Sequence, residues 1–103
     1  MHSDTRREVV LGLVALGLVA LERLHEAIVN QGFAYARIGR IALPFLAVPV
    51  LHLPGVQIMV HVQLGRAGPD VYVWDRGHRR HPVRDVCGAA ARLLAEVRTG
   101  GGE

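Results

Sequence analysis

The chain has 103 residues, of which 50% are hydrophobic and 20% charged, and this composition excludes a disordered segment and favours one domain, 1–103, with its own core. All of the basic residues are arginine, and the net charge of +3 is too small to require a polyanionic partner. The single cysteine, Cys87, has no partner for an internal disulfide, so we expect a cytoplasmic protein.

The first predicted element is a long helix from about Thr5 to Asn30. Glu8 lies in its first turn, where the helix dipole favours an acid, and Gly32 follows its last turn as a stop signal. One stripe of this helix, with residues three and four apart, is apolar and suited to packing on a sheet. Its members are Val10, Val14, Gly17, Leu21, Leu24 and Ile28.

The N-terminal half of this helix is apolar on its other faces as well, through Leu11, Leu16 and Leu18. A helix that lies on one small sheet buries only one side, so these leucines need a second covering surface. A second copy of the chain is the simplest cover, and we expect a homodimer or a contact with another protein. The alternative is that the apolar segment 41–54 wraps the helix completely.

A pair of arginines, Arg6 and Arg7, precedes the apolar run 9–21 and resembles the head of a secretion signal. The run continues into Glu22 without a small-residue cleavage site. It is also shorter than the roughly 20 residues that span a bilayer. We therefore expect a structural helix and no association with a membrane.

The middle of the chain predicts the first strands of an antiparallel sheet. The segment 33–43 is rich in residues that favour strands. The segment 41–54 is also apolar but contains Pro44, Pro49 and Pro54. Since proline donates no hydrogen bond to a neighbouring strand, we expect this segment at a sheet edge or in an irregular, extended wrap.

Alternation of apolar and polar residues makes 56–64 the clearest strand, and 71–75 and 78–83 follow as shorter ones. A second helix is predicted over 86–98, with Asp85 as its N-cap. The expected fold class is therefore α+β, with a long N-terminal helix, an antiparallel sheet of three to four strands and a C-terminal helix.

A possible interaction face follows from the alternation in the strand 71–75. If Val71 and Val73 point to the core, Tyr72 and Trp74 lie on the outer face together with polar residues of the preceding strand. Exposed aromatic residues are typical of protein interfaces, and beside glutamines they also suit stacking of single-stranded bases. The candidate interface residues are Leu11, Leu16, Leu18, Gln57, His61, Tyr72 and Trp74.

A cluster of basic and imidazole side chains lies just before the second helix, where the helix dipole favours negative charge. Arginine side chains suit phosphate or carboxylate, so the cluster is a candidate anion site and would fit a nucleic acid. The alternative is a solvated hairpin tip that prevents aggregation at a sheet edge. The cluster consists of Arg76, His78, Arg79, Arg80, His81 and Arg84.

The chain offers little for catalysis, because its hydroxyl side chains besides tyrosine are Ser3, Thr5 and Thr99, and it has no lysine. We expect no enzyme, no catalytic residue, no metal and no cofactor. Arginines surround the histidines that would bind a metal and repel a cation. The leading hypothesis is a homodimeric interaction module, and the second is a nucleic-acid-binding or regulatory protein. The third is a catalytic or metal site built on Asp75, His61, His78 and His81, in which His52 is an alternative to His61 as a metal ligand.

Overall fold

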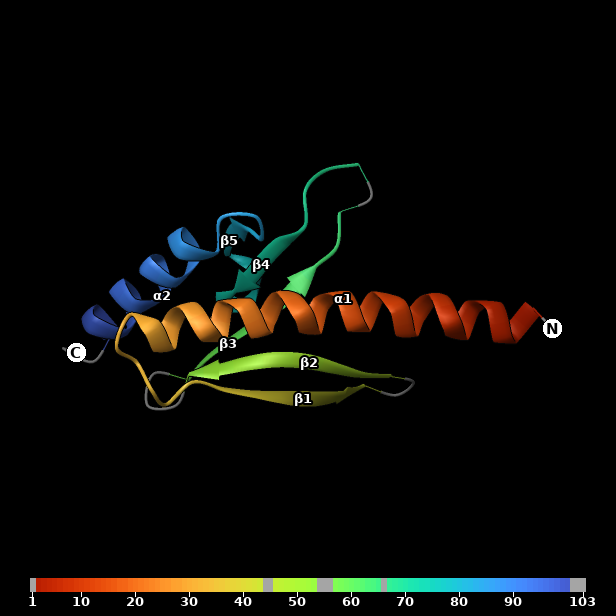
Figure 1. Ribbon diagram of the computed structural model, residues 1–103, viewed down its shortest axis with the longest axis horizontal. Coiled ribbons are helices and arrows are strands. Elements are labelled where there is room, and N and C mark those ends of the chain that lie inside the picture. Colours follow the sequence, from red (N-terminus) through yellow and green to blue (C-terminus); the bar gives the residue numbers. More distant parts are fainter. Residues whose placement is uncertain (1, 44–45, 54–56, 66, 101–103) are drawn as a thin grey trace.

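A computed structural model describes the backbone of residues 2–43, 46–53, 57–65 and 67–100, and the side chains of residues 14–41, 48–53, 57–65 and 67–98. The strands form one antiparallel sheet in the order β1-β2-β3-β4-β5. The α+β class is thus confirmed, with five strands in the described residues in place of the three to four expected. The elements in chain order are α1 (His2–Asn30), β1 (Arg37–Leu43), β2 (Leu46–Leu53), β3 (Ile58–Gln63), β4 (Val71–Trp74), the 3-10 turn η1 (Asp75–Gly77), β5 (Arg79–Pro82) and α2 (Val86–Gly100) (Figure 1).

The additional strand is β2, which comes from the proline-rich segment. It pairs with β1 over its whole length but with β3 only at Leu51–Leu53. Pro49 therefore lies where β2 has no paired neighbour on the β3 side, and its missing N–H removes no hydrogen bond to β3. Of the two alternatives, the irregular wrap was wrong, because the segment 46–53 forms a regular strand. The sheet edge describes the part of β2 around Pro49, which pairs with β1 alone. Pro44 and Pro54 lie outside the described residues.

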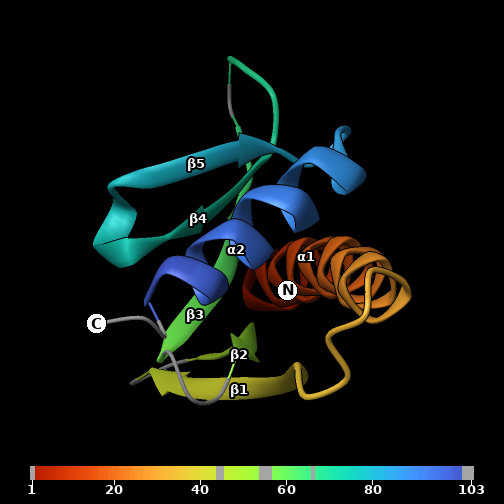
Figure 2. The ribbon, with the colours of Figure 1, turned by 90° about the vertical axis from the view of Figure 1, so that its left-hand side faces the viewer.

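The sheet bends at β3, which changes partner halfway along its length. Ile58–Val60 pairs with β2, and His61–Gln63 pairs with β4. Figure 2 shows the result: the pairs β1–β2 and β4–β5 lie on opposite sides of β3, and both helices lie in the concave side of the sheet. Helix α1 follows the long axis of a molecule that measures 53 × 26 × 24 Å (Figure 1).

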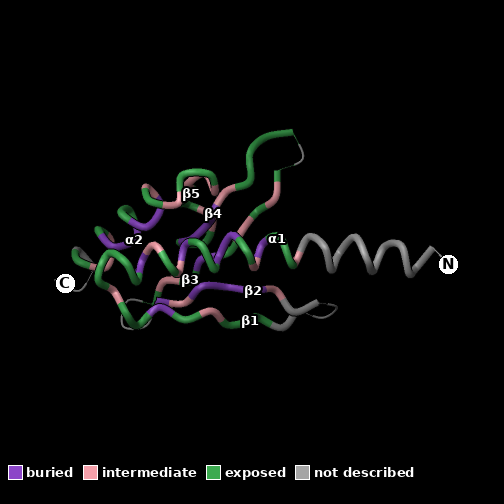
Figure 3. The backbone as a smooth tube through the Cα atoms, viewed as in Figure 1, coloured by how far each residue is buried: buried purple, intermediate pink, exposed green. Residues whose placement is uncertain are grey.

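The core lies between the concave side of the sheet and the two helices. The predicted α1 stripe is confirmed at Leu21, Leu24 and Ile28, which are fully buried. Figure 3 shows buried and exposed stretches alternating along α1, as in a helix with one side on the core. Gly17 faces the sheet, and a Cβ at this position would lie in ordinary contact with the Cβ of Val62, at 3.9 Å. The side chain of Val10 lies outside the described residues. The remaining fully buried apolar side chains of this cluster are Leu51, Leu53, Val60, Tyr72, Ala89, Ala90 and Leu93.

Helix α2 begins where the sequence predicts it. The carboxylate Oδ1 of Asp85 accepts a hydrogen bond of 3.2 Å from the N–H of Gly88, which makes Asp85 the N-cap. Its other oxygen, Oδ2, lies 2.8 Å from Nε2 of His81 in β5. The hydrogen bond with His81, and then the one with Gly88, lower the pKa of the Asp85 carboxyl. The cap therefore also joins α2 to the edge strand of the sheet.

Candidate functional site

The aromatic residues of β4 face the core and not the outer surface. Tyr72 pairs with Val62 across the ladder, and residues opposite each other in an antiparallel pair share a face. Tyr72 is 0% exposed and Trp74 is 1% exposed. The predicted outer face with both aromatic side chains is therefore wrong, and neither residue is available to a partner of the folded chain.

The physical reason is that both aromatic side chains find polar partners on the helices. The hydroxyl of Tyr72 donates a hydrogen bond of 2.7 Å to the carbonyl oxygen of Ala20 in α1. Burial of two large rings also removes more apolar area from water than burial of two valines. β4 is apolar at every position. Alternation along the strand alone therefore did not determine whether the two valines or the two aromatic residues face the helices. Val73 alternates to the opposite face of the sheet, and it is buried there as well, with 2% of its surface exposed.

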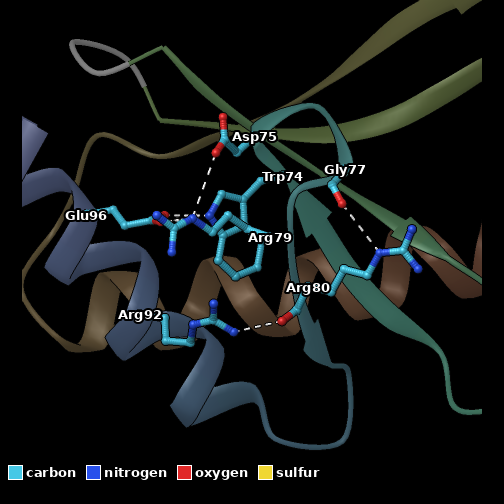
Figure 4. A network of polar contacts seen from close by, with 7 residues as sticks. All are labelled: Trp74, Asp75, Gly77, Arg79, Arg80, Arg92 and Glu96. Carbon is cyan, nitrogen blue, oxygen red and sulfur yellow. Dashed lines mark hydrogen bonds and ion pairs between the residues drawn. The ribbon is translucent and has the colours of Figure 1, made fainter.

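Trp74 lies at the centre of a polar network that fixes α2 to β4 and β5 (Figure 4). Its Nε1 donates a hydrogen bond to Glu96, and the guanidinium of Arg92 lies over its ring, 5.2 Å from the centroid. Arg92 also donates a hydrogen bond of 2.7 Å to the carbonyl oxygen of Arg80. Glu96 and Arg92 could not be recognised from the sequence, because their partners are remote in the chain. The network joins elements of the fold and contains a fully buried indole ring.

Strand alternation divides the predicted basic cluster between the two faces of β5. Arg79 and His81 are engaged by carboxylates: Arg79 Nε lies 3.0 Å from Oε1 of Glu96, and His81 pairs with Asp85. Arg80, between them, is exposed and alternates to the opposite face. Two members of the cluster thus have a carboxylate partner in the same chain, and Arg79 remains exposed beside its partner.

The other members of the cluster lie at the two ends of β5. Arg76 is exposed in η1 with a positive φ of 57°, and His78 is exposed just after it. Arg84 is exposed in the turn before α2, whose N-terminus already holds the carboxylate of Asp85. The six residues thus lie on η1, along β5 and in the turns on either side of β5.

The histidines are similarly dispersed. His61 is exposed on the side of the sheet opposite the helices, His52 is half-buried, and the Nε2 of His81 is engaged by Asp85. Within the part of the chain that the structure describes, no three histidine, cysteine, aspartate or glutamate residues are placed to hold one metal ion. Cys87 is exposed in the first turn of α2.

The residues that remain as a candidate site are apolar side chains on the free side of α1. Leu16 is 61% exposed and Val19 is 45% exposed. They are three residues apart on the helix, so they lie side by side. Ala15 beside them is also exposed, and we call these three residues the α1 apolar surface. The expectation that segment 41–54 wraps the helix completely is contradicted at Leu16. Val19 was missed from the sequence, although its spacing from Leu16 pointed to it.

The other predicted interface residues have different surroundings. Leu18 is half-buried, and the side chain of Leu11 lies outside the described residues. Gln57 and His61 are exposed as expected, but Gln57 lies in the turn before β3 and not on the strand. These two polar residues therefore do not extend the α1 apolar surface.

Figure 2 shows the free side of α1 along the helix axis: the sheet and α2 lie on one side, and none of the described helices and strands covers the opposite side. Elsewhere the exposed large apolar residues are dispersed over α1, the α1–β1 loop, β1 and β3: Val29, Tyr35, Ile41 and Met59. Tyr35 packs edge-to-face against Phe33 with ring centroids 6.0 Å apart. The α1 apolar surface thus stands out as a group of adjacent exposed apolar side chains.

Comparison with known proteins finds no family, curated protein or solved structure that matches this chain. None of the helices that the structure describes combines the length and the apolar character needed to cross a bilayer.

Proposed function

We propose that this protein is a small, non-enzymatic, cytoplasmic interaction module that associates with a second copy of itself through the α1 apolar surface. The observation that carries the proposal is the exposure of Leu16, 61%, next to Val19, 45%, on a helix whose opposite face is fully buried on its own sheet. Adjacent apolar side chains left in water are typical of surfaces that a partner covers. An exposed thiol at Cys87 is compatible with a reducing compartment.

A nucleic-acid-binding function has less support. It depends on the predicted basic cluster, in which Arg79 and His81 are paired with carboxylates inside the fold. The arginines left over, at 76, 80 and 84, lie on different elements and faces. Titration of labelled DNA or RNA at two salt concentrations tests this alternative, because phosphate contacts weaken steeply as salt rises whereas an apolar contact does not.

Sedimentation equilibrium over a wide concentration range tests the proposal. We expect the wild-type chain to be dimeric, and the variant with both Leu16→Gln and Val19→Gln to dissociate at least about tenfold more readily, since each burial is worth roughly 1.5–3 kcal/mol. Val29→Gln is the matched control, because Val29 is 40% exposed on the same helix but outside the α1 apolar surface. We expect this control to associate like the wild type.

Two results would overturn the proposal. One is a wild-type chain that sediments as a monomer at every concentration. The other is a double variant that associates as tightly as the wild type while circular dichroism shows that both are folded. The far-ultraviolet spectrum of each variant separates loss of contact from loss of structure, since substitutions at exposed positions are expected to leave the fold intact.

A further inference from the structure

We propose that the free edge of β1 binds an extended acidic segment of another protein, which adds a strand to the sheet and places carboxylates opposite Arg37 and Arg40. This edge is separate from the α1 apolar surface, so the proposal goes beyond self-association and does not depend on it. It follows from a regular strand with one unpaired edge and from two exposed arginines on that strand.

β1 is a regular edge strand. All seven of its residues pair with β2 in one register, from Arg37 opposite His52 to Leu43 opposite Leu46. β1 stands first in the order of the sheet, so among the described strands it pairs with β2 alone. Figure 1 shows none of the described elements along its other edge. Alternate residues of such an edge direct their N–H and C=O groups away from the sheet, where an added strand can pair with them.

The edge at the other end of the sheet is protected by comparison. β5 has four residues and ends at Pro82, which has no N–H to donate. The carbonyl oxygen of Arg80 in β5 accepts its hydrogen bond from the side chain of Arg92. β1 is longer and contains no proline. Of the two sheet edges, the edge of β1 is therefore the one that can pair with a further strand.

The charge of β1 determines what kind of strand fits. The sequence has no aspartate or glutamate between Glu26 and Asp70, so the ionisable residues of β1, β2 and β3 are arginine and histidine. Arg37 and Arg40 are exposed. Among the described side chains, none of the ion pairs includes either arginine, or Glu22 and Glu26 on α1. A partner with carboxylates therefore complements the charge of this edge.

The spacing of the two arginines specifies the partner further. Arg37 and Arg40 are three residues apart, so alternation places them on opposite faces of β1. Residues opposite each other in neighbouring strands share a face. A partner strand meets both guanidinium groups when its own carboxylates are three residues apart, whichever direction it runs. Arginine binds carboxylates through paired hydrogen bonds, which adds to the backbone pairing.

The same charges make a second copy of β1 a poor occupant of this edge. β1 carries two arginines and no acidic residue, so no alignment of two copies brings an arginine opposite a carboxylate. The antiparallel alignment that pairs all seven residues places Arg40 level with Arg40, which is repulsive. The occupant is therefore a segment of a different, acidic chain.

Fluorescence anisotropy of labelled peptides tests the proposal. The capped peptide Thr-Glu-Val-Thr-Glu-Val-Thr has glutamates three residues apart among residues that favour strands. We expect it to bind with saturation below about 1 mM. An isomer with glutamates two apart, Thr-Glu-Val-Glu-Thr-Val-Thr, should bind about threefold more weakly, since one of its carboxylates lies on the wrong face. The peptide with glutamine in place of both glutamates should bind about tenfold more weakly.

Charge reversal in the protein provides the matched variants. We expect Arg37→Glu and Arg40→Glu each to weaken binding of the first peptide about fivefold, because an attractive pair becomes repulsive. Arg76→Glu is the control with the same change in net charge, at an exposed position in η1, and should bind like the wild type. The variant with both β1 substitutions should prefer Thr-Lys-Val-Thr-Lys-Val-Thr, which also shows that it is folded.

Amide hydrogen exchange gives an independent readout of strand addition. On saturation with the first peptide, exchange should slow at alternate residues of β1, those whose N–H groups point away from β2. Unchanged exchange at β1 would overturn the proposal, and so would equal affinity for the glutamate and glutamine peptides or the absence of saturation. Oligothymidylate that displaces the peptide at equal charge would overturn it in favour of a phosphate site. None of these results affects the sedimentation test of self-association.

Discussion

The hydroxyl of Tyr72 is the main polar link between the sheet and α1. It is fully buried, and it donates its proton to the carbonyl oxygen of Ala20, a residue 52 positions earlier in the chain. Burial raises the pKa of Tyr72 from 10.0 to about 12, and the Arg23 guanidinium opposes this change weakly. A side chain that must stay protonated in the core makes the fold sensitive to alkaline solution.

We predict that the free energy of unfolding falls as the pH rises from 10 to 12. The folded-state pKa of Tyr72 lies above its unfolded value, so its contribution is fully present below pH 10 and lost as the pH approaches 12. A difference of two pKa units corresponds to roughly 3 kcal/mol. Tyr72→Phe should cost about 1 kcal/mol at neutral pH and flatten the alkaline loss. Urea unfolding at a series of pH values measures both effects.

Tyr35 provides the comparison for this prediction, since it is the other tyrosine of the chain and is 71% exposed. In Tyr35→Phe the alkaline loss should persist, and the absorbance of tyrosinate should then report Tyr72 alone. A Tyr72→Phe variant that loses stability above pH 10 as steeply as the wild type would show that another group causes the loss.

At the scale of the helix, Gly17 and Gly88 differ in the space around them, so we expect alanine to have different effects at the two positions. A Cβ at Gly17 in α1 would be in ordinary contact with Val62, at 3.9 Å. A Cβ at Gly88 in α2 would overlap the carboxylate of Asp85 and lie 2.9 Å from Nε2 of His81. Both positions are helical, so the intrinsic gain from alanine is the same.

We predict that Gly17→Ala stabilises the protein by about 1 kcal/mol, because alanine is favoured over glycine in a helix and the space at Gly17 is sufficient. Gly88→Ala should not stabilise the protein, because its methyl group displaces the carboxylate that caps α2. Thermal unfolding measured side by side tests this contrast. In a background with both Asp85→Ala and His81→Ala, which removes the two side chains that a Cβ at Gly88 would meet, Gly88→Ala should regain its stabilising effect. Equal effects of both alanines in the wild-type chain would contradict the prediction.

At the scale of the whole molecule, the two faces of α1 differ in how they are covered. Its inner face packs on the bent sheet, and its outer face carries the α1 apolar surface, for which the described chain provides no cover. If a second copy covers that surface, folding and association are coupled, because the dimer binds only folded chains.

We predict that the midpoint of thermal unfolding of the wild-type chain rises as the protein concentration increases, since mass action favours the dimer. Leu16→Gln should remove most of this dependence, because it places a polar group at the centre of the contact. Differential scanning calorimetry over a hundredfold concentration range measures the effect. A midpoint that is independent of concentration in the wild type would contradict it.

The sequence by itself determined the helices, the α+β class and the clearest strand. Regular spacing fixes which side of α1 is apolar, and Asp85 marks the start of α2. The sequence also predicted apolar side chains on α1 beyond those that the sheet covers, and Leu16 is exposed as expected. These features depend on neighbours within a few residues along the chain, and such neighbours are readable from spacing alone.

Tertiary structure alone decided the rest, because it depended on which residues meet across the sheet. The register of β3 with β4 turned Tyr72 and Trp74 inward, where Ala20 and Glu96 satisfy their polar atoms. Alternation along β5 separated the basic cluster, and divergence of β2 from β3 made room for Pro49. A strand apolar on both faces, a run of arginines and a proline each allow two placements, and only packing against residues far along the chain selects one.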